Sequence, residues 1–263
     1  MEDIRFSSTR AGKIGSDILA SALDASLGEG LNPKLVKLDL CDNSFANKAS
    51  HGALYRALGS TTSLTYLNLR DCDLGDDGVQ KICHALFESD SALEHLDLSG
   101  NCVEKRGAKH IADYIRDCGG KLKILHLEDN ELTSKGVESI AAAFHGSEDG
   151  HSIEEIQLNT CMVGAIGARA LIDAFGPDGK DLPNLKKIFL NGNSFAEDVL
   201  GELEVAFDDR LGEMDDNDSD GDADDNLSDD EEEDDGEDED GTVAAVDDSV
   251  DDLAAAMDKS LLV

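Results

Sequence analysis

Leucine and isoleucine recur along most of the chain in one fixed spacing, L-x-x-L-x-L, with polar residues at most of the x positions. Copies begin at Leu35, Leu64, Leu93, Leu122, Ile153 and Leu185, and a degenerate copy opens the chain at Met1. The first four complete copies are 29 residues apart. Self-similarity at a fixed period is typical of a solenoid, in which each unit buries its apolar face only against its neighbours.

Each unit combines a short strand with a helix. Alternate residues of a strand point to one side, so the last two apolar residues of the spacing face the interior. Behind them, apolar residues return at helical intervals, as at Val79, Ile82 and Leu86. A glycine marks the turn into four of these helices: Gly78, Gly107, Gly136 and Gly167. The pattern predicts an α/β leucine-rich-repeat solenoid of the ribonuclease-inhibitor-like type over residues 1–207, with about seven repeats, a parallel sheet inside and helices outside.

One position at the inner turn after each strand is polar or a cysteine. Along the chain it reads Thr9, Asn43, Cys72, Asn101, Asn130, Cys161 and Asn193. An asparagine there can bond the backbone of adjacent coils, whereas a cysteine packs as a small buried hydrophobe with a weak donor. Cys72 and Cys161 therefore belong to the repeat, and no C-x-x-C pair occurs, so we expect free thiols in a reducing compartment.

The C-terminal quarter differs in character. The net charge of the chain is −37, and from Glu213 to Asp240 most residues are Asp or Glu and none is Lys or Arg. Such a segment buries too little apolar surface to offset its ordering entropy, so we predict a disordered acidic tail over residues 208–245. Residues 246–263 carry apolar residues at helical intervals, which fits either a short docking helix or a transient helix within the tail.

Half of a calcium-loop pattern of the EF-hand type begins at Asp216 and ends at Gly221. The twelfth position of such a loop should be a bidentate Glu, but here it is Leu227, and no amphipathic helices flank it. We therefore expect only weak, adventitious calcium binding by a polyanion.

Several classes of function are disfavoured. Binding of nucleic-acid phosphates requires concentrated positive charge, which this acidic chain lacks, so we do not expect nucleic acid as a partner. We expect a basic protein surface as the partner instead. No run of 18 apolar residues is present, so we expect no membrane insertion. Neither a phosphate-binding loop nor a nucleophile motif appears, so we expect no catalytic residue and no cofactor.

The residues between the last two apolar positions of each strand should stack side by side across the sheet. This row reads Arg5, Asp39, Asn68, Asp97, His126, Gln157 and Phe189. Asp97 and His126 become neighbours, with His95 two residues before Asp97, so a His/Asp/His metal site is one interpretation. A solvated polar row with a local ion pair is the other. We favour the second and assign no metal, because the sequence displays no groups that would support the ligands.

Taken together, these features resemble the C-terminal part of Ran GTPase-activating proteins. The final unit over residues 188–197, an amphipathic segment that ends at Phe207 and the acidic run follow one another in the same order. The S-S-T-R sequence at residues 7–10, followed by Gly12, is similar to the S-S-T-R-x-G repeat of plant-type members. The resemblance spans essentially the whole chain.

The resemblance implies a regulator rather than an enzyme, one that accelerates GTP hydrolysis by the small GTPase Ran in nucleocytoplasmic transport. The implied partner is Ran in its GTP form, together with Ran-binding protein. The implied location is the cytoplasm, the perinuclear region and nuclear envelope, or the nucleus. In that family an asparagine on a strand-to-helix loop helps to orient the GTPase's own glutamine, which positions the attacking water, and the activator supplies no arginine finger.

That asparagine lies in the repeat immediately before the S-S-T-R unit, and this sequence starts at Met1 inside that unit. We therefore expect an N-terminally truncated activator that lacks the catalytic asparagine. An incomplete gene model and a naturally short relative that binds without activating both remain open. The alternative function is an acidic leucine-rich-repeat scaffold that binds a basic protein partner without activating it.

Contact residues are expected on the strand-to-helix rim, where exposed side chains of a rigid repeat meet a partner. By the resemblance, Arg10 of the S-S-T-R motif contacts Ran. The remaining candidates are chosen by geometry alone and are Lys13, Asp42, Lys48, Asp71, Asp73 and Lys105.

Overall fold

The computed structural model describes residues 2–9, 12–27, 34–117, 121–145, 151–176 and 182–217. Strands and helices alternate along these residues. They are β1 (Asp3–Arg5), α1 (Gly12–Leu27), β2 (Lys37–Asp39), α2 (Lys48–Gly59), β3 (Tyr66–Asn68), α3 (Gly75–Glu88), β4 (His95–Asp97), α4 (Lys105–Asp117), β5 (Ile124–His126), α5 (Thr133–Ala143), β6 (Glu155–Gln157), α6 (Ala165–Phe175), β7 (Lys187–Phe189), α7 (Glu197–Phe207) and the 3-10 helix η1 (Asp208–Arg210). Within this part of the chain, every helix is too short or too polar to cross a bilayer.

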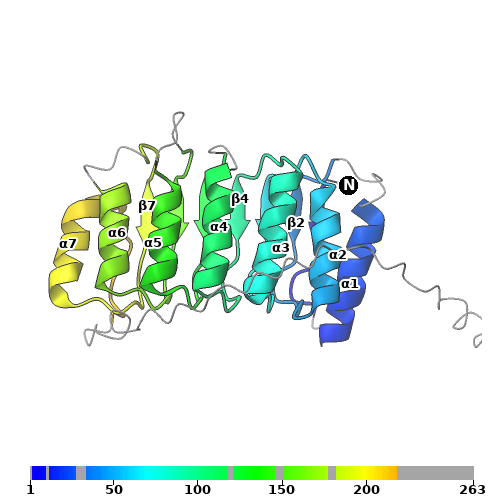
Figure 1. Ribbon diagram of the computed structural model, residues 1–263, viewed down its shortest axis with the longest axis horizontal. Helices are drawn as coiled ribbons and strands as arrows, with labels where there is room; N and C mark the ends of the chain where they lie inside the picture. The colour runs from blue at the N-terminus through cyan, green and yellow to red at the C-terminus, as the bar shows by residue number, and fades with distance from the viewer. Residues whose placement is uncertain are drawn as a thin grey trace, which may run out of the picture. The chain divides into compact units, whose positions relative to one another are not determined.

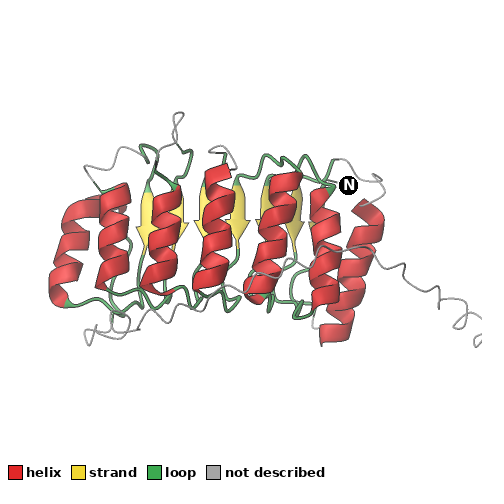
Figure 2. Cartoon of the chain, viewed as in Figure 1, coloured by secondary structure: helices red, strands yellow, loops and turns green. Residues whose placement is uncertain are grey.

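The strands form one parallel sheet in which each strand pairs with the next one along the chain, from β1 to β7. The helices lie side by side in the same order and cover one face of the sheet (Figures 1 and 2). Neighbouring helices pack against one another along their lengths, as do neighbouring strands. Each repeat is therefore one strand and one helix, and its contacts are with the repeats before and after it.

The core lies between the sheet and the helix layer. The last two apolar residues of every complete repeat are fully buried, from Leu38 and Leu40 at the second strand to Ile188 and Leu190 at the seventh. Burying a leucine side chain contributes about 1.5–3 kcal/mol, so these pairs dominate the stability. The first, degenerate repeat differs, because Phe6 lies at the position of Leu40 and remains 46% exposed.

The inner-turn position forms a ladder of hydrogen bonds, as the sequence predicts. Asn101 donates to the carbonyls of Leu69 and Leu98, at 2.8 and 2.9 Å, and its side-chain oxygen accepts from the backbone N–H groups of Cys72 and Leu74. One side chain thus bonds its own coil and the preceding coil. The asparagines at the same position, Asn43, Asn130 and Asn193, also donate to backbone carbonyls of the preceding coil. The cysteines, Cys72 and Cys161, donate to such a carbonyl through Sγ, and the hydroxyl of Thr9 donates to the side-chain oxygen of Asn43.

The four periodic glycines do not lie at turns, contrary to the sequence interpretation. Gly78, Gly107, Gly136 and Gly167 all lie within the first turn of their helices. A Cβ atom added at Gly136 would lie 2.9 Å from Cβ of Ala108 in the preceding helix, and one added at Gly167 would lie 3.0 Å from Cα of Ser134. These glycines therefore permit the close approach of successive helices.

The segment 208–217, predicted as the start of the disordered tail, continues the repeat body instead. Leu211 forms a parallel bridge with Ile188 of β7, and the N–H of Gly212 donates to the carbonyl of Ile188 at 2.8 Å. Asn217 accepts a bond from the N–H of Asn193 and donates to the carbonyl of Met214, which adds one more member to the inner-turn ladder. Asp216, the first residue of the calcium-loop pattern, accepts a bond from the side-chain amide of Asn191 at 3.0 Å, and the rest of that pattern beyond residue 217 lies outside the described residues. The predicted tail beyond 217 and the possible helix at 246–263 lie outside the described residues.

Thiol reactivity should divide the cysteines sharply. Burial raises the pKa of Cys161 to about 12, whereas Cys102 is exposed. Since the thiolate is the nucleophile, iodoacetamide applied to the folded chain at neutral pH should modify Cys102 and leave Cys161 intact until the chain is unfolded. Peptide mapping by mass spectrometry checks this, and rapid labelling of Cys161 without unfolding would contradict the burial described above.

Candidate functional site

The exposed rim is formed by the loops that lead from the strands to the helices. In each loop the residue before the ladder position has a positive φ, including Asp42 (56°) and Asp71 (53°), and Asp73 after the ladder position has a φ of 54°. Aspartate tolerates this left-handed backbone better than most residues. These three aspartates, with Gly12, Asn43, Ser44 and Gly100, line an open hollow of about 360 Å³.

The structure brings together only part of the predicted contact set. Asp42, Asp71 and Asp73 are exposed and share the hollow. The predicted lysines lie separately from it: Lys48 and Lys105 are the first residues of α2 and α4, and Lys13 lies in the first turn of α1. Arg10, the residue carried over from the resemblance, lies outside the described residues. The rim that the structure describes is therefore acidic at its centre.

A glycine fixes the shape of this hollow. Gly100 has a φ of +67°, and a Cβ atom at this position would lie 2.0 Å from Oδ1 of Asp71. A charged group that was not predicted from the sequence lies close by: the guanidinium of Arg70 is 3.4 Å from Asp71 and 3.0 Å from Glu128, two coils further on. The hydrogen bond to Glu128 raises the pKa of Arg70 despite partial burial. Repeat position offered a signal, because Arg70 and Glu128 both follow the last leucine of their strands.

The helix-free face of the sheet carries the predicted polar row in the predicted register. Arg5 pairs with Asp39, Asn68 with Asp97, Asp97 with His126, and His126 with Gln157. This stacking is confirmed residue for residue, because each repeat contributes one strand of equal length.

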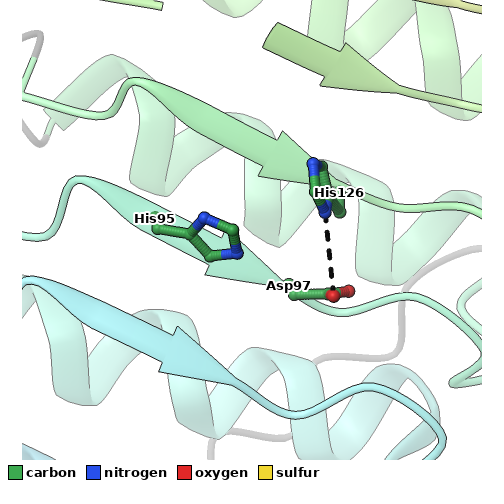
Figure 3. Close-up of side chains that lie close together, drawn as sticks. All are labelled: His95, Asp97 and His126. Atoms are coloured by element: carbon green, nitrogen blue, oxygen red, sulfur yellow. Dashed lines mark ion pairs between the residues drawn. The ribbon is translucent and has the colours of Figure 1, made fainter. Parts of the chain in front are cut away.

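Three side chains of this face form a compact cluster, shown in Figure 3: His95 and Asp97 from β4, and His126 from β5. One nitrogen or oxygen ligand atom of each lies within 4.8 Å of those of the other two. Nδ1 of His126 lies 3.7 Å from Oδ2 of Asp97, and Nε2 of His126 lies 2.9 Å from Oε1 of Glu155. The local ion pair that the sequence suggested is therefore present.

The charges of this cluster follow from its half-buried position. Burial acts to raise the pKa of Asp97, but His126 and the N–H of Ser99 outweigh burial and lower it. Burial acts to lower the pKa of His126, but Asp97 and Glu155 outweigh burial and raise it. For His95, burial dominates and the pKa is lowered. The imidazole of His95 is therefore neutral at physiological pH, whereas that of His126 is stabilised in its charged form.

The chain resembles several proteins that contain leucine-rich repeats. The family model described as "Leucine Rich repeat" matches residues 61–83, 91–112 and 121–141. RAN GTPase-activating protein 2 of Arabidopsis thaliana is 34% identical over 162 residues, which cover 60% of this chain and 27% of that protein. The ribonuclease inhibitor of Mus musculus is 28% identical over 170 residues, covering 65% of this chain and 36% of that protein.

A third relative belongs to a different class. NACHT, LRR and PYD domains-containing protein 14 of Mus musculus is 27% identical over 161 residues, covering 61% of this chain and 16% of that protein. This chain thus spans about a quarter of the length of the Arabidopsis relative and 16% of the length of the NACHT, LRR and PYD domains-containing protein. Matches and structure together confirm the predicted fold: residues 2–217 form, over their described part, a leucine-rich-repeat solenoid of the ribonuclease-inhibitor-like type, with a parallel sheet backed by a layer of helices.

Proposed function

We propose that this chain provides the leucine-rich-repeat surface of a GTPase-activating protein for the small GTPase Ran, acting in nucleocytoplasmic transport. The observation that carries the proposal is the 34% identity to RAN GTPase-activating protein 2 over 162 residues, which cover 60% of this chain. The S-S-T-R sequence at residues 7–10 also supports it, because it resembles the motif of plant-type members of that family.

The physical argument for binding at the rim is preorganisation. Asn43 is held by the carbonyls of Phe6 and Leu40, each at 2.7 Å, and by the hydroxyl of Thr9. The loops that carry Asp42 and Asp71 are therefore fixed before a partner arrives, and little conformational entropy is lost on association. Three exposed carboxylates on such a surface attract a basic patch and accelerate encounter with it.

The first test is nucleotide-selective binding. Purified full chain is titrated with Ran loaded with a non-hydrolysable GTP analogue, and with Ran loaded with GDP, at two salt concentrations. We expect saturable binding that prefers the GTP form. Equal binding to both forms, or none, would reject the proposal. A parallel measurement of GTP hydrolysis shows whether this chain alone also accelerates the reaction.

A second candidate, an acidic scaffold that holds a basic partner without activating it, is favoured by the net charge of −37. It predicts binding to unrelated basic proteins, independent of any nucleotide and steeply weakened by salt. The same titration separates the two candidates, because only the first depends on the state of Ran.

Neutralising the rim should weaken Ran binding. The triple variant Asp42→Asn, Asp71→Asn and Asp73→Asn keeps residues that tolerate a left-handed backbone and removes three charges. We expect roughly tenfold weaker binding, equal to about 1.4 kcal/mol, mostly through slower association. Surface plasmon resonance at low salt measures this.

The matched control removes three charges from the helix layer, by Asp117→Asn, Asp173→Asn and Glu204→Gln, all exposed residues. It should bind Ran as the natural chain does. If both variants lose affinity equally, only net charge matters. If neither does, these three carboxylates do not contribute to the contact, and contact by Arg10 remains the prediction to test.

A further inference from the structure

We propose that His95, Asp97 and His126 form a binding site for a divalent transition-metal ion of the zinc type on the helix-free face of the sheet. This inference does not depend on the proposed function. It reverses the preference drawn from sequence alone, because the structure supplies the supporting groups that the sequence did not display.

The spacing of the cluster fits an ion better than a direct hydrogen bond. Nδ1 of His126 and Oδ2 of Asp97 lie 3.7 Å apart, beyond hydrogen-bonding distance. Two ligands at about 2.0–2.1 Å from one tetrahedral zinc ion are roughly 3.3 Å apart. His95 lies two residues before Asp97 on β4, hence on the same face, and its ring centroid is 5.2 Å from that of His126. The three ligand atoms lie within 4.8 Å of one another, so side-chain rotation would have to bring them closer to hold one ion.

An ion bound at Nδ1 of His126 would displace the proton that Asp97 and Glu155 stabilise there, and neighbouring groups leave the other required atoms available. Glu155 engages Nε2 of His126 at 2.9 Å and is itself held by the side-chain amide of Gln157 at 2.9 Å. This directs Nδ1 of His126 toward Asp97. The N–H of Ser99 donates to Oδ1 of Asp97 at 3.0 Å, which leaves Oδ2 for the ion. A carboxylate behind a ligating histidine is the usual support for such a ligand, and it makes the imidazole a stronger donor.

His95 is held by stacking instead. Its ring lies 4.5 Å from that of Tyr66 on the preceding strand, with an interplanar angle of 27°. All three ligands are thus positioned by adjacent strands of a rigid sheet.

The donor set selects the kind of ion. Two imidazoles and one carboxylate suit zinc and its neighbours among the first-row divalent ions, whereas calcium and magnesium need six or more oxygen ligands. Three protein ligands leave a fourth position of a tetrahedral ion open to water or to a ligand atom from a partner.

The test is a zinc titration of the full, untagged chain, measured by isothermal titration calorimetry in a non-chelating buffer with a phosphine reductant. The double variant His95→Ala and His126→Ala is compared with His84→Ala and His110→Ala, which removes two imidazoles from α3 and α4. We expect one zinc site in the natural chain. The variant with His95→Ala and His126→Ala should bind zinc there at least a hundredfold more weakly, and the variant with His84→Ala and His110→Ala should retain the affinity of the natural chain. Glu155→Gln, which removes no ligand, should weaken the site by about 10–100-fold.

Cobalt provides a direct view of the ligands. Co²⁺ bound to the natural chain should show the intense visible absorption of a four-coordinate ion, and the first double variant should lack it. If the two double variants bind zinc with equal affinity and stoichiometry, the ion is held adventitiously by acidic residues or thiols and the proposal is overturned. Absence of any site in the natural chain overturns it as well.

Discussion

Replacing Asn101 by alanine should strongly destabilise the protein. Asn101 is fully buried, and its side chain accepts bonds from the N–H groups of Cys72 and Leu74 at 3.1 and 3.3 Å. Without the amide, these two buried donors and the carbonyls of Leu69 and Leu98 lose a partner. Each unsatisfied buried group costs about 1–3 kcal/mol, so we expect a loss of roughly 3–5 kcal/mol. Urea denaturation followed by circular dichroism measures it.

The natural chain suggests a graded comparison. Cys72 and Cys161 occupy the same ladder position, and their Sγ atoms donate to the carbonyls of Leu40 and Leu127 at 3.2 and 3.1 Å. Asn101→Cys should therefore lie between the natural chain and Asn101→Ala in stability. Asn68→Ala, on the helix-free face, should cost about 1 kcal/mol or less, because the bonds lost there, to the N–H of Arg70 and to Tyr66, lie on a partly exposed surface. Equal costs at Asn68 and Asn101 would show that the inner-turn ladder contributes nothing beyond an ordinary surface bond.

Gly167→Ala is the second change with a large expected effect on stability, and we expect it to destabilise the protein, which is unusual for alanine in place of a helical glycine. Alanine in place of a helical glycine normally stabilises by about 0.5–1 kcal/mol. At this position the added Cβ would lie 2.6 Å from Cγ1 of Val163 and 3.0 Å from Cα of Ser134 on α5. Backbone atoms cannot rotate away, so α5 and α6 must separate. We expect a loss of about 1–3 kcal/mol, read from the urea midpoint.

Gly201 of α7 provides the matched control. A Cβ atom there meets nothing within 4 Å, so Gly201→Ala should raise stability by about 0.5–1 kcal/mol. Opposite signs at the two glycines are the expected result. A stabilising effect at both would mean that the spacing of α5 and α6 is not set by the glycine.

The repeat period was sufficient to predict which residues lie side by side on the sheet. Identical units stack with identical offsets, so Asp97 had to pair with His126 once the period was known. The same logic predicted the inner-turn ladder. These features depend only on position within the repeat, which the sequence displays directly.

Features that depend on distances between side chains or between helices were missed. The periodic glycines looked like turn residues, yet their role is the approach of one helix to the next, which no single repeat reveals. The support of His126 by Glu155 depends on the side-chain conformations of both residues. The strand-like segment at Leu211 was not predicted from the sequence for two reasons. The last two apolar residues of each repeat are two positions apart, whereas Leu211 and Met214 are three apart, and acidic residues surround the segment.

That last segment protects the end of the sheet. A strand with unpaired backbone groups is a template for pairing with another chain, and natural sheets cover such edges. Here Leu211 and Gly212 lie along β7, and Arg210 donates to the carbonyls of Phe175 and Ala206 at 3.1 and 2.9 Å. A shortened chain designed to omit the acidic run should therefore retain residue 217. Ending it at Phe207 would expose β7 and invite self-association.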